Sequence, residues 1–223
     1  MNKSPKILIK FPSRGRPERF KSSFEKYLNF LSGNYGFYFV FSFDENDLTM
    51  NNNDMISYLE KYNHISEYHF GKNTNKVEAI NANMENKTFD ILILASDDMI
   101  PVVKNYDEVI VSNFQKSGFD YDCMLHFHNI KFCNELDINC VMGYDYYKRF
   151  NYIYHPSYKS IFADNEYTEV SKILGKNVFI HGVEPFYHDW RGGDETEIKN
   201  FKYNREDWEV WENRKKNNYD LNL

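Results

Sequence analysis

The sequence predicts an α/β protein in which a mainly parallel central sheet is flanked by helices. Strand-like apolar runs alternate with helical segments through the first hundred residues, which is the order typical of a parallel sheet with covering helices. Two of these runs end in acidic residues, at Asp44 and Asp98, so both acidic loops should lie at one edge of the sheet. The 223 residues contain no Pro/Gly/Ser-rich linker and are enough for the core of one large domain.

The first half of the chain divides into four expected strands and three expected helices. Pro17 suits the first turn of the first helix, whose five apolar residues recur at helical spacing (Phe20, Phe24, Tyr27, Leu28 and Leu31). The four apolar residues from Ile91 to Leu94 are typical of a strand that is buried on both faces. The expected strands cover residues 6–11, 37–43, 65–70 and 90–95, and the expected helices cover residues 18–31, 54–62 and 75–86.

The second half is less regular. Residues 123–127 and 140–143 are short apolar runs that fit strands, and an antiparallel pairing suits them. A helix over residues 165–174 should end at Gly175. From Arg191 onward the chain is polar and charged, with two tryptophans as the expected anchors of this segment (Trp208 and Trp211). A further helix is expected over residues 106–114 and a further strand over residues 178–181.

Composition excludes several classes of function. The net charge of -6 argues against a general nucleic-acid-binding protein, which would usually be basic. The three cysteines are odd in number and lack CxxC spacing, which argues against a zinc site and a disulfide framework (Cys123, Cys133 and Cys140). The N-terminus has no apolar signal-peptide core and no stretch approaches 18 apolar residues, so we expect a cytoplasmic protein without a membrane span.

Adjacent carboxylates end the buried run at Ser96-Asp97-Asp98. Two neighbouring carboxylates repel each other and persist most easily beside a cation, so one interpretation is a divalent metal that holds a phosphorylated substrate. The alternative is a solvated turn, because Asp is common after strands. These residues alone do not separate the two interpretations.

Six segments in a fixed order carry a resemblance to a known family. They are Pro12-Ser-Arg-Gly-Arg16, Phe41-Ser-Phe-Asp44, Asn75-Lys76 with Ala79, Asn81 and Asn83, Ser96-Asp97-Asp98, Ile161-Phe-Ala-Asp-Asn-Glu166, and Phe186-Tyr-His-Asp-Trp190. In this order, over roughly residues 6–215, the chain resembles the family-2-type glycosyltransferases of the GT-A fold. The resemblance implies one GT-A-like domain over residues 1–223. Its expected parts are a nucleotide-binding half at 1–100, an acceptor-side half at 101–190 and a polar, helical C-terminal extension at 191–223.

The resemblance implies a donor site for a nucleotide sugar, most simply a UDP-sugar. Asp44 would accept a hydrogen bond from the nucleotide base. Arg14 and Arg16 suit the diphosphate, because a guanidinium matches phosphate geometry and Gly15 lets the backbone approach closely; the alternative is a solvated basic loop. The full set of expected donor-binding residues is Pro12, Ser13, Arg14, Arg16, Asp44, Asn75, Lys76 and Asp97.

The resemblance also implies a metal site and a catalytic base. Asp98 and His188 are the expected ligands of Mn²⁺ or Mg²⁺, and His181 is the competing histidine. Asp164 is the expected general base, with Glu166 as the alternative; a helix N-cap is the structural interpretation of Asp164. Transfer to an acceptor hydroxyl would invert the anomeric centre, and the acceptor could be a glycan, a lipid-linked sugar, a protein or a modified nucleobase.

The chain departs from the family pattern in its metal motif, in the acidic pair that Asp164 lacks, and in the absence of the Gln-x-x-Arg-Trp signature of processive synthases. A strict Asp-x-Asp motif would need Asp at position 96, where Ser96 stands, so metal binding rests on Asp98. A catalytically inactive GT-A-like domain that binds a nucleotide or glycan is therefore one rival function. A nucleotidyltransferase is the other, although Ser13-Arg-Gly-Arg-Pro17 is a poor match to the Gly-rich, lysine-containing loop of that class.

Overall fold

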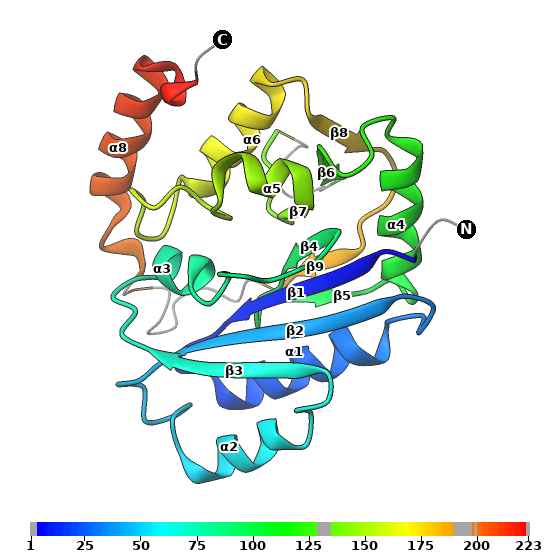
Figure 1. Ribbon diagram of the computed structural model, residues 1–223. Helices are drawn as coiled ribbons and strands as arrows, with labels where there is room; N and C mark the ends of the chain where they lie inside the picture. Colours follow the sequence, from blue (N-terminus) through cyan, green and yellow to red (C-terminus); the bar gives the residue numbers. More distant parts are fainter. Residues whose placement is uncertain (1–3, 129–134, 190–197, 199, 222–223) are drawn as a thin grey trace.

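Seven strands form one twisted sheet at the centre of the molecule (Figure 1). The computed structural model describes residues 4–128, 135–189, 198 and 200–221. In the order in which they lie side by side, the strands are β3 (Ser66–Gly71), β2 (Gly36–Asp44), β1 (Lys6–Pro12), β4 (Ile91–Leu94), β7 (Val141–Gly143), β6 (Met124–Phe127) and β8 (Asn177–Ile180).

The first half of the sheet is parallel, as predicted. β1 pairs in parallel with both β2 and β4, and β2 pairs in parallel with β3. The expected strands at residues 6–11 and 90–95 are therefore neighbours, and Phe11, Phe43 and Ala95 lie at one edge. β7 runs antiparallel to both β4 and β6, which confirms the antiparallel pairing expected for residues 123–127 and 140–143. The order places the four parallel strand ends together where the acidic loops begin.

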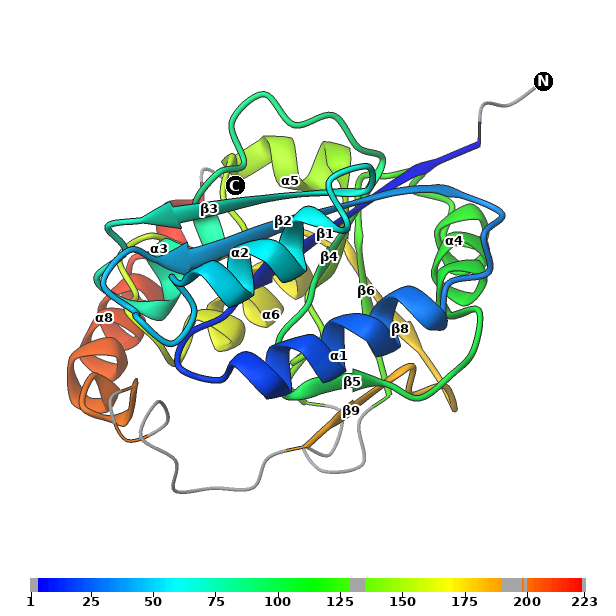
Figure 2. The ribbon, with the colours of Figure 1, turned by 90° about the horizontal axis from the view of Figure 1, so that it is seen from below.

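Helices cover both faces of the sheet (Figures 1 and 2). One face carries α1 (Pro17–Asn29), α2 (Asn53–Glu60) and α4 (Tyr106–Lys116), and the other carries α3 (Lys76–Asn81), α5 (Tyr144–Phe150) and α6 (Ala163–Ile173). A last helix, α8 (Asn204–Lys216), packs beside α6 and is followed by the 3-10 turn η1 (Asn218–Asp220). The chain is thus a three-layer α/β structure.

Alternation along β1 divides the core into two layers. Ile7, Ile9 and Phe11 face α1, whereas Leu8 faces α3 and α5. Aromatic rings fill much of the first layer: Phe20 of α1 makes edge-to-face contacts with Phe11, Phe41 and Phe43 at centroid distances of 5.0–5.2 Å. The high aromatic content therefore serves mainly to fill the core.

The structure corrects several predicted elements. α3 ends at Asn81 and not at residue 86, because Asn83 and Asn86 adopt positive φ angles that a helix cannot contain. Three elements were not predicted: α5 and the two strands of a separate ladder, β5 (Met99–Pro101) and β9 (Phe186–His188). Trp208 is not an anchor, since it is 47% exposed; Trp211 is one, and it stacks on Phe162.

Some sequence-based expectations concern residues outside the described part of the chain. Cys133, Trp190 and residues 191–197 lie there. Within the described part, Cys123 and Cys140 are buried free thiols. No helix in that part combines the length and the apolar character needed to cross a membrane.

A buried lysine ties α3 to the sheet. The Lys10 side chain is fully buried on β1, and its Nζ donates to the Ala82 carbonyl at 2.6 Å and to the Ser42 hydroxyl. Burial lowers the pKa of Lys10 to about 7, against an opposing effect from Glu67 and Glu85. The Lys10 side chain therefore holds the end of α3 by hydrogen bonds, and its burial has removed the water that would otherwise stabilise its charge.

Lys10 should make the fold more stable as the pH rises above 7. Its pKa is about 7 in the folded chain against 10.5 for an ordinary lysine, so the unfolded chain binds more protons between these values. Stability should rise there by up to about 1.4 kcal/mol per pH unit. Urea unfolding at pH 7 and pH 9 should show wild type gaining stability relative to Lys10→Met. The exposed control Lys61→Met keeps Lys10, so wild type should show no such gain relative to it. An equal pH response of wild type and Lys10→Met would contradict the assignment.

Candidate functional site

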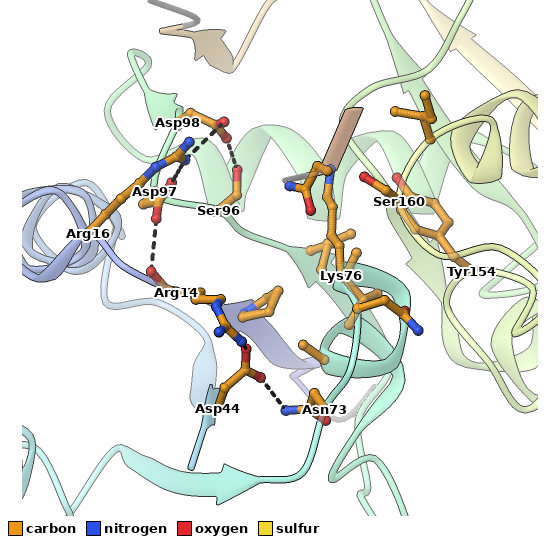
Figure 3. Close-up of a pocket in the computed structure, with 18 of the residues that line it drawn as sticks. Arg14, Arg16, Asp44, Asn73, Lys76, Ser96, Asp97, Asp98, Tyr154 and Ser160 are labelled. Atoms are coloured by element: carbon orange, nitrogen blue, oxygen red, sulfur yellow. Dashed lines mark hydrogen bonds and ion pairs between the residues drawn. The ribbon is translucent and has the colours of Figure 1, made fainter. Parts of the chain in front are cut away.

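A cleft of about 810 Å³ opens at the carboxyl ends of the parallel strands (Figure 3). Its walls come from the loop after β1, the ends of β2, β3 and β4, the first turn of α3, the loop before α6 and the end of β9. The predicted meeting of the acidic loops is confirmed, because Asp44, Asp97 and Asp98 all line this cleft. The residues preferred for the site all line it, and the two alternatives, Glu166 and His181, do not.

Asp44 occupies one side of the cleft, at the end of β2. Its carboxylate forms an ion pair with Arg14 and accepts a hydrogen bond from Asn73 Nδ2 at 3.0 Å (Figure 3). Gly15, between the two arginines, donates its backbone N–H to Asp47 at 2.6 Å. The loop after β1 is therefore fixed to the loop after β2, with charged groups at the cleft surface.

Asp97 holds the start of α1. Its carboxylate accepts from Ser13 Oγ at 2.8 Å and from Arg16 Nη1 at 2.8 Å, and it is 5% exposed. Burial raises the pKa of Asp97, and the charge of Arg16 opposes that rise. Both carboxylate oxygens already have protein donors, so Asp97 organises the loop that carries Ser13 and Arg16.

Asp98 and His188 face each other in the cleft. The distance from Asp98 Oδ2 to His188 Nε2 is 3.9 Å, and Asp98 Oδ1 accepts from Ser96 Oγ at 2.5 Å. The unpredicted β5–β9 ladder explains this meeting, because it pairs Met99 with His188 and lets the Asp189 N–H donate to the Asp98 carbonyl at 2.8 Å. Residues almost ninety positions apart are thus placed together by backbone pairing.

The electrostatics around Asp98 keep it ionised. Burial would raise the pKa of Asp98, but interactions with His188 and Ser96 and the charge of Lys76 outweigh burial and lower it below the usual aspartate range. Ser96, which replaces the first Asp of a strict motif, thus stabilises the charged form of Asp98 by donating a hydrogen bond. A permanently ionised carboxylate is a good ligand for a hard cation.

The Asp98–His188 pair fits one divalent cation. Two ligand atoms that each lie about 2.1 Å from one ion can be at most about 4.2 Å apart, and the observed 3.9 Å is within that limit. Among the described residues there is no cluster of three or more His, Cys, Asp or Glu side chains that could hold a metal. A cation here would therefore take its remaining ligands from water and from a bound substrate.

Asn75 and Lys76 begin α3, at the middle of the cleft. Asn75 caps the helix, because its side chain accepts the Glu78 N–H at 2.9 Å. Lys76 lies between the Asp97–Asp98 side and the Tyr154–Ser160 side in Figure 3. Its charge opposes the rise in the pKa of Asp164 and lowers the pKa of Asp98. Lys76 thus supplies positive charge at the middle of the cleft, and Asn75 stabilises the first turn of α3.

Asp164 lines the cleft from the first turn of α6. It is not the helix N-cap, because Phe162 occupies that position in a left-handed conformation, although Asp164 Oδ1 does accept the Asn165 N–H at 3.1 Å. Burial raises the pKa of Asp164, with Lys76 and His188 as opposing charges. A carboxylate with a raised pKa is a better proton acceptor than an ordinary aspartate.

Two alternatives from the sequence lie elsewhere. Glu166 is 3% exposed and points away from the cleft, where it binds Arg214 through two hydrogen bonds of 2.6 and 2.8 Å and accepts from the Tyr158 hydroxyl at 2.8 Å. His181 is exposed beyond β8, packs on Phe179, and does not line the cleft. The structure thus brings Asp164 and His188 into one site and leaves Glu166 and His181 out of it.

Solved structures with a similar fold are found, whereas no family model and no curated protein sequence matches the chain. TarS residues 1–349 from S. aureus, in complex with UDP-GlcNAc, superpose with a TM-score of 0.63 at 12% identity. The mannosyltransferase PcManGT from Pyrobaculum calidifontis, in complex with GDP-Man and Mn²⁺, superposes with a TM-score of 0.59 at 9% identity. This chain has the GT-A glycosyltransferase fold.

The similarity covers most of this chain but only part of the other proteins. It spans 86% of this chain and 60% of the TarS 1–349 chain, and 82% of this chain and 56% of the mannosyltransferase. At these identities the comparison establishes the GT-A fold.

Within the GT-A fold, the cleft residues that were missed from the sequence include Asn73, Tyr154 and Ser160. Asn73 follows β3 at the edge where Asp44 follows β2, so the rule that placed Asp44 also points to Asn73. Tyr154 and Ser160 lie in an irregular segment between α5 and α6, and neither has a local motif. Only the tertiary structure brings these two to the cleft.

Proposed function

We propose that this chain is a metal-dependent, inverting glycosyltransferase that moves a sugar from a nucleotide-sugar donor, most simply a UDP-sugar, to a hydroxyl acceptor. The observation that carries the proposal is that one cleft brings together the ionised Asp98 beside His188, the cation Lys76, and Asp164 with its raised pKa. A diphosphate leaving group and an acceptor hydroxyl need these kinds of group in one place.

The donor nucleotide would lie against the ends of β1 and β2. Asp44 can accept a hydrogen bond from the imide N–H of uracil while it keeps its contacts with Arg14 and Asn73, since a carboxylate accepts several hydrogen bonds. Arg14, Arg16 and Lys76 supply positive charge toward the diphosphate. Pro12 and Ser13 shape the backbone that the nucleotide meets, and Asp97 keeps Arg16 in place.

Asp98 and His188 are the residues that would hold Mn²⁺ or Mg²⁺. One carboxylate and one imidazole suit Mn²⁺ well and are compatible with Mg²⁺. The bound cation would neutralise charge on the leaving diphosphate. The pair supports this assignment because its two ligand atoms, 3.9 Å apart, lie within the span of one ion.

Asp164 would accept the proton of the acceptor hydroxyl. The acceptor oxygen bonds to the anomeric carbon, the bond from that carbon to the diphosphate oxygen breaks, and the proton passes to Asp164. Asp164 comes from the loop and helix that face the strand ends, whereas Asp98 comes from the strand side. A base on the side opposite the leaving group favours a single displacement, which inverts the anomeric centre.

Titration with UDP, with and without Mn²⁺, followed by a UDP-sugar hydrolysis assay, tests the proposal. We expect UDP binding that strengthens with Mn²⁺ and slow release of UDP from the donor. Metal-dependent UDP binding without cleavage of the UDP-sugar would favour the rival function, a catalytically inactive domain that binds a nucleotide. Release of pyrophosphate from a nucleoside triphosphate and a sugar phosphate would favour a nucleotidyltransferase.

Replacing His188 by Ala should weaken UDP binding in Mn²⁺ by about tenfold or more and leave metal-free binding unchanged, because the imidazole acts only through the cation. Isothermal titration in Mn²⁺ and in EDTA measures both values. His181→Ala is the matched control, since His181 is exposed and outside the cleft. If His181→Ala loses the metal effect and His188→Ala keeps it, the ligand assignment is wrong.

A further inference from the structure

The hydroxyl of Ser160 is buried at the cleft without a hydrogen-bond partner in the described part of the chain. Ser160 is 5% exposed and lines the cleft, and its Oγ makes no hydrogen bond to any described residue. A buried hydroxyl without a partner is uncommon and costs free energy, because it has given up its bonds to water. In a substrate-binding cleft, such a group is available for a ligand.

Ser160 lies on the wall that faces the donor side. In Figure 3, Tyr154 and Ser160 stand on the far side of Lys76 from Asp44, Asp97 and Asp98. Leu136, Ile138 and Ile161 also line the cleft, and so do the aromatic side chains of Phe201 and Tyr203. The cleft lining therefore offers a hydroxyl, aromatic rings and aliphatic side chains.

The segment that carries Ser160 is rigidly held. Asp207 of α8 is fully buried, and its carboxylate accepts the backbone N–H groups of Lys159, Ser160 and Ile161 at 2.9, 2.8 and 2.9 Å. The Lys159 carbonyl accepts the Val77 N–H of α3 at 3.2 Å. The position of the Ser160 hydroxyl is thus set from α8 and α3 together, close in the chain to Asp164 on α6.

We propose that Ser160 binds the acceptor and that the acceptor group is a pyranose ring. The inference rests on the proposed function, since it assigns the second substrate of that reaction. A pyranose has apolar C–H faces that suit Tyr154 and the aliphatic residues that line the cleft, and hydroxyls that can donate to or accept from Ser160 Oγ. The hydroxyl that attacks would then lie on the Asp164 side of the ring.

Saturation-transfer NMR with methyl β-D-glucopyranoside, methyl β-D-galactopyranoside and methyl α-D-mannopyranoside, in UDP and Mg²⁺, tests the inference. At least one glycoside should bind to the wild-type chain. Ser160→Ala should weaken that binding about fivefold, the worth of one neutral hydrogen bond, and leave UDP affinity unchanged. The thermal midpoint should not fall, because the lost hydroxyl makes no hydrogen bond to any residue that the structure describes.

Ser171→Ala is the matched control. Ser171 is equally buried, on α6 outside the cleft, but its hydroxyl donates to the Thr168 carbonyl at 2.8 Å and accepts from Asn177 at 2.9 Å. Its loss should lower the thermal midpoint by about 2–4 °C and leave glycoside binding unchanged.

Three outcomes would overturn the inference. UDP binding without binding of any of the glycosides overturns it and leaves the proposed function standing. Weaker UDP binding by Ser160→Ala, with glycoside binding unchanged, also overturns it and places Ser160 on the donor. Absence of UDP binding by the wild-type chain overturns both the proposed function and the acceptor role.

Discussion

Replacing Asp164 by Asn should lower the rate of sugar transfer by roughly 10²–10⁴-fold, the usual worth of a positioned general base. Asn keeps the shape of the side chain and an oxygen that can accept the Asn165 N–H, which Asp164 Oδ1 now accepts at 3.1 Å. It removes only the basicity that burial increases at this position. UDP affinity and the thermal midpoint should therefore remain close to the wild-type values.

Single-turnover kinetics with a UDP-sugar, beside UDP titration and thermal melting, measure these three properties. Glu166→Gln is the informative companion, since Glu166 is two residues away on α6 but outside the cleft. It should lower the thermal midpoint and leave the transfer rate of the folded enzyme unchanged. The opposite pattern, with transfer lost in Glu166→Gln and retained in Asp164→Asn, would make Glu166 the base.

The parallel half of the fold was predictable because its signals are local. Each expected strand is a short apolar run that ends in polar residues, and strands joined by helices pair in parallel. That topology alone predicts that Asp44 and Asp98 lie at the same edge of the sheet, and both line the cleft. No such local signal marks β5 and β9, which have three residues each and are strands only because they pair with each other.

The site residues that could be predicted are those that directly follow a strand or that belong to one of the six motifs found in a fixed order along the sequence. Asp98 and Asp164 belong to this class, and both line the cleft. His188 was placed by its motif, but its approach to Asp98 depends on the β5–β9 ladder. Glu166 shows the limit: one helix carries both Asp164 and Glu166, and only packing against α8 decides which carboxylate faces the cleft.

The second large effect is expected on the free energy of unfolding, when the buried ion pair between Arg214 of α8 and Glu166 of α6 is lost. Arg214→Met should destabilise the chain by about 3–5 kcal/mol, because it leaves the Glu166 carboxylate buried without its cationic partner. The side chains of Arg214 and Glu166 are only 11% and 4% exposed, and two hydrogen bonds join them. Urea unfolding measures the loss, and the thermal midpoint should fall by about 6–20 °C.

A double-mutant cycle separates the pair from the packing of the arginine stem. Glu166→Gln combined with Arg214→Met should be less destabilising than the sum of the two single changes, since no buried charge is then left unpaired. Arg205→Met is the matched control on α8: its pair with Glu209 is exposed, at 92% and 58%, and its loss should change stability by less than about 0.5 kcal/mol. If Arg214→Met were as mild as Arg205→Met, the buried pair would not hold α8 against α6.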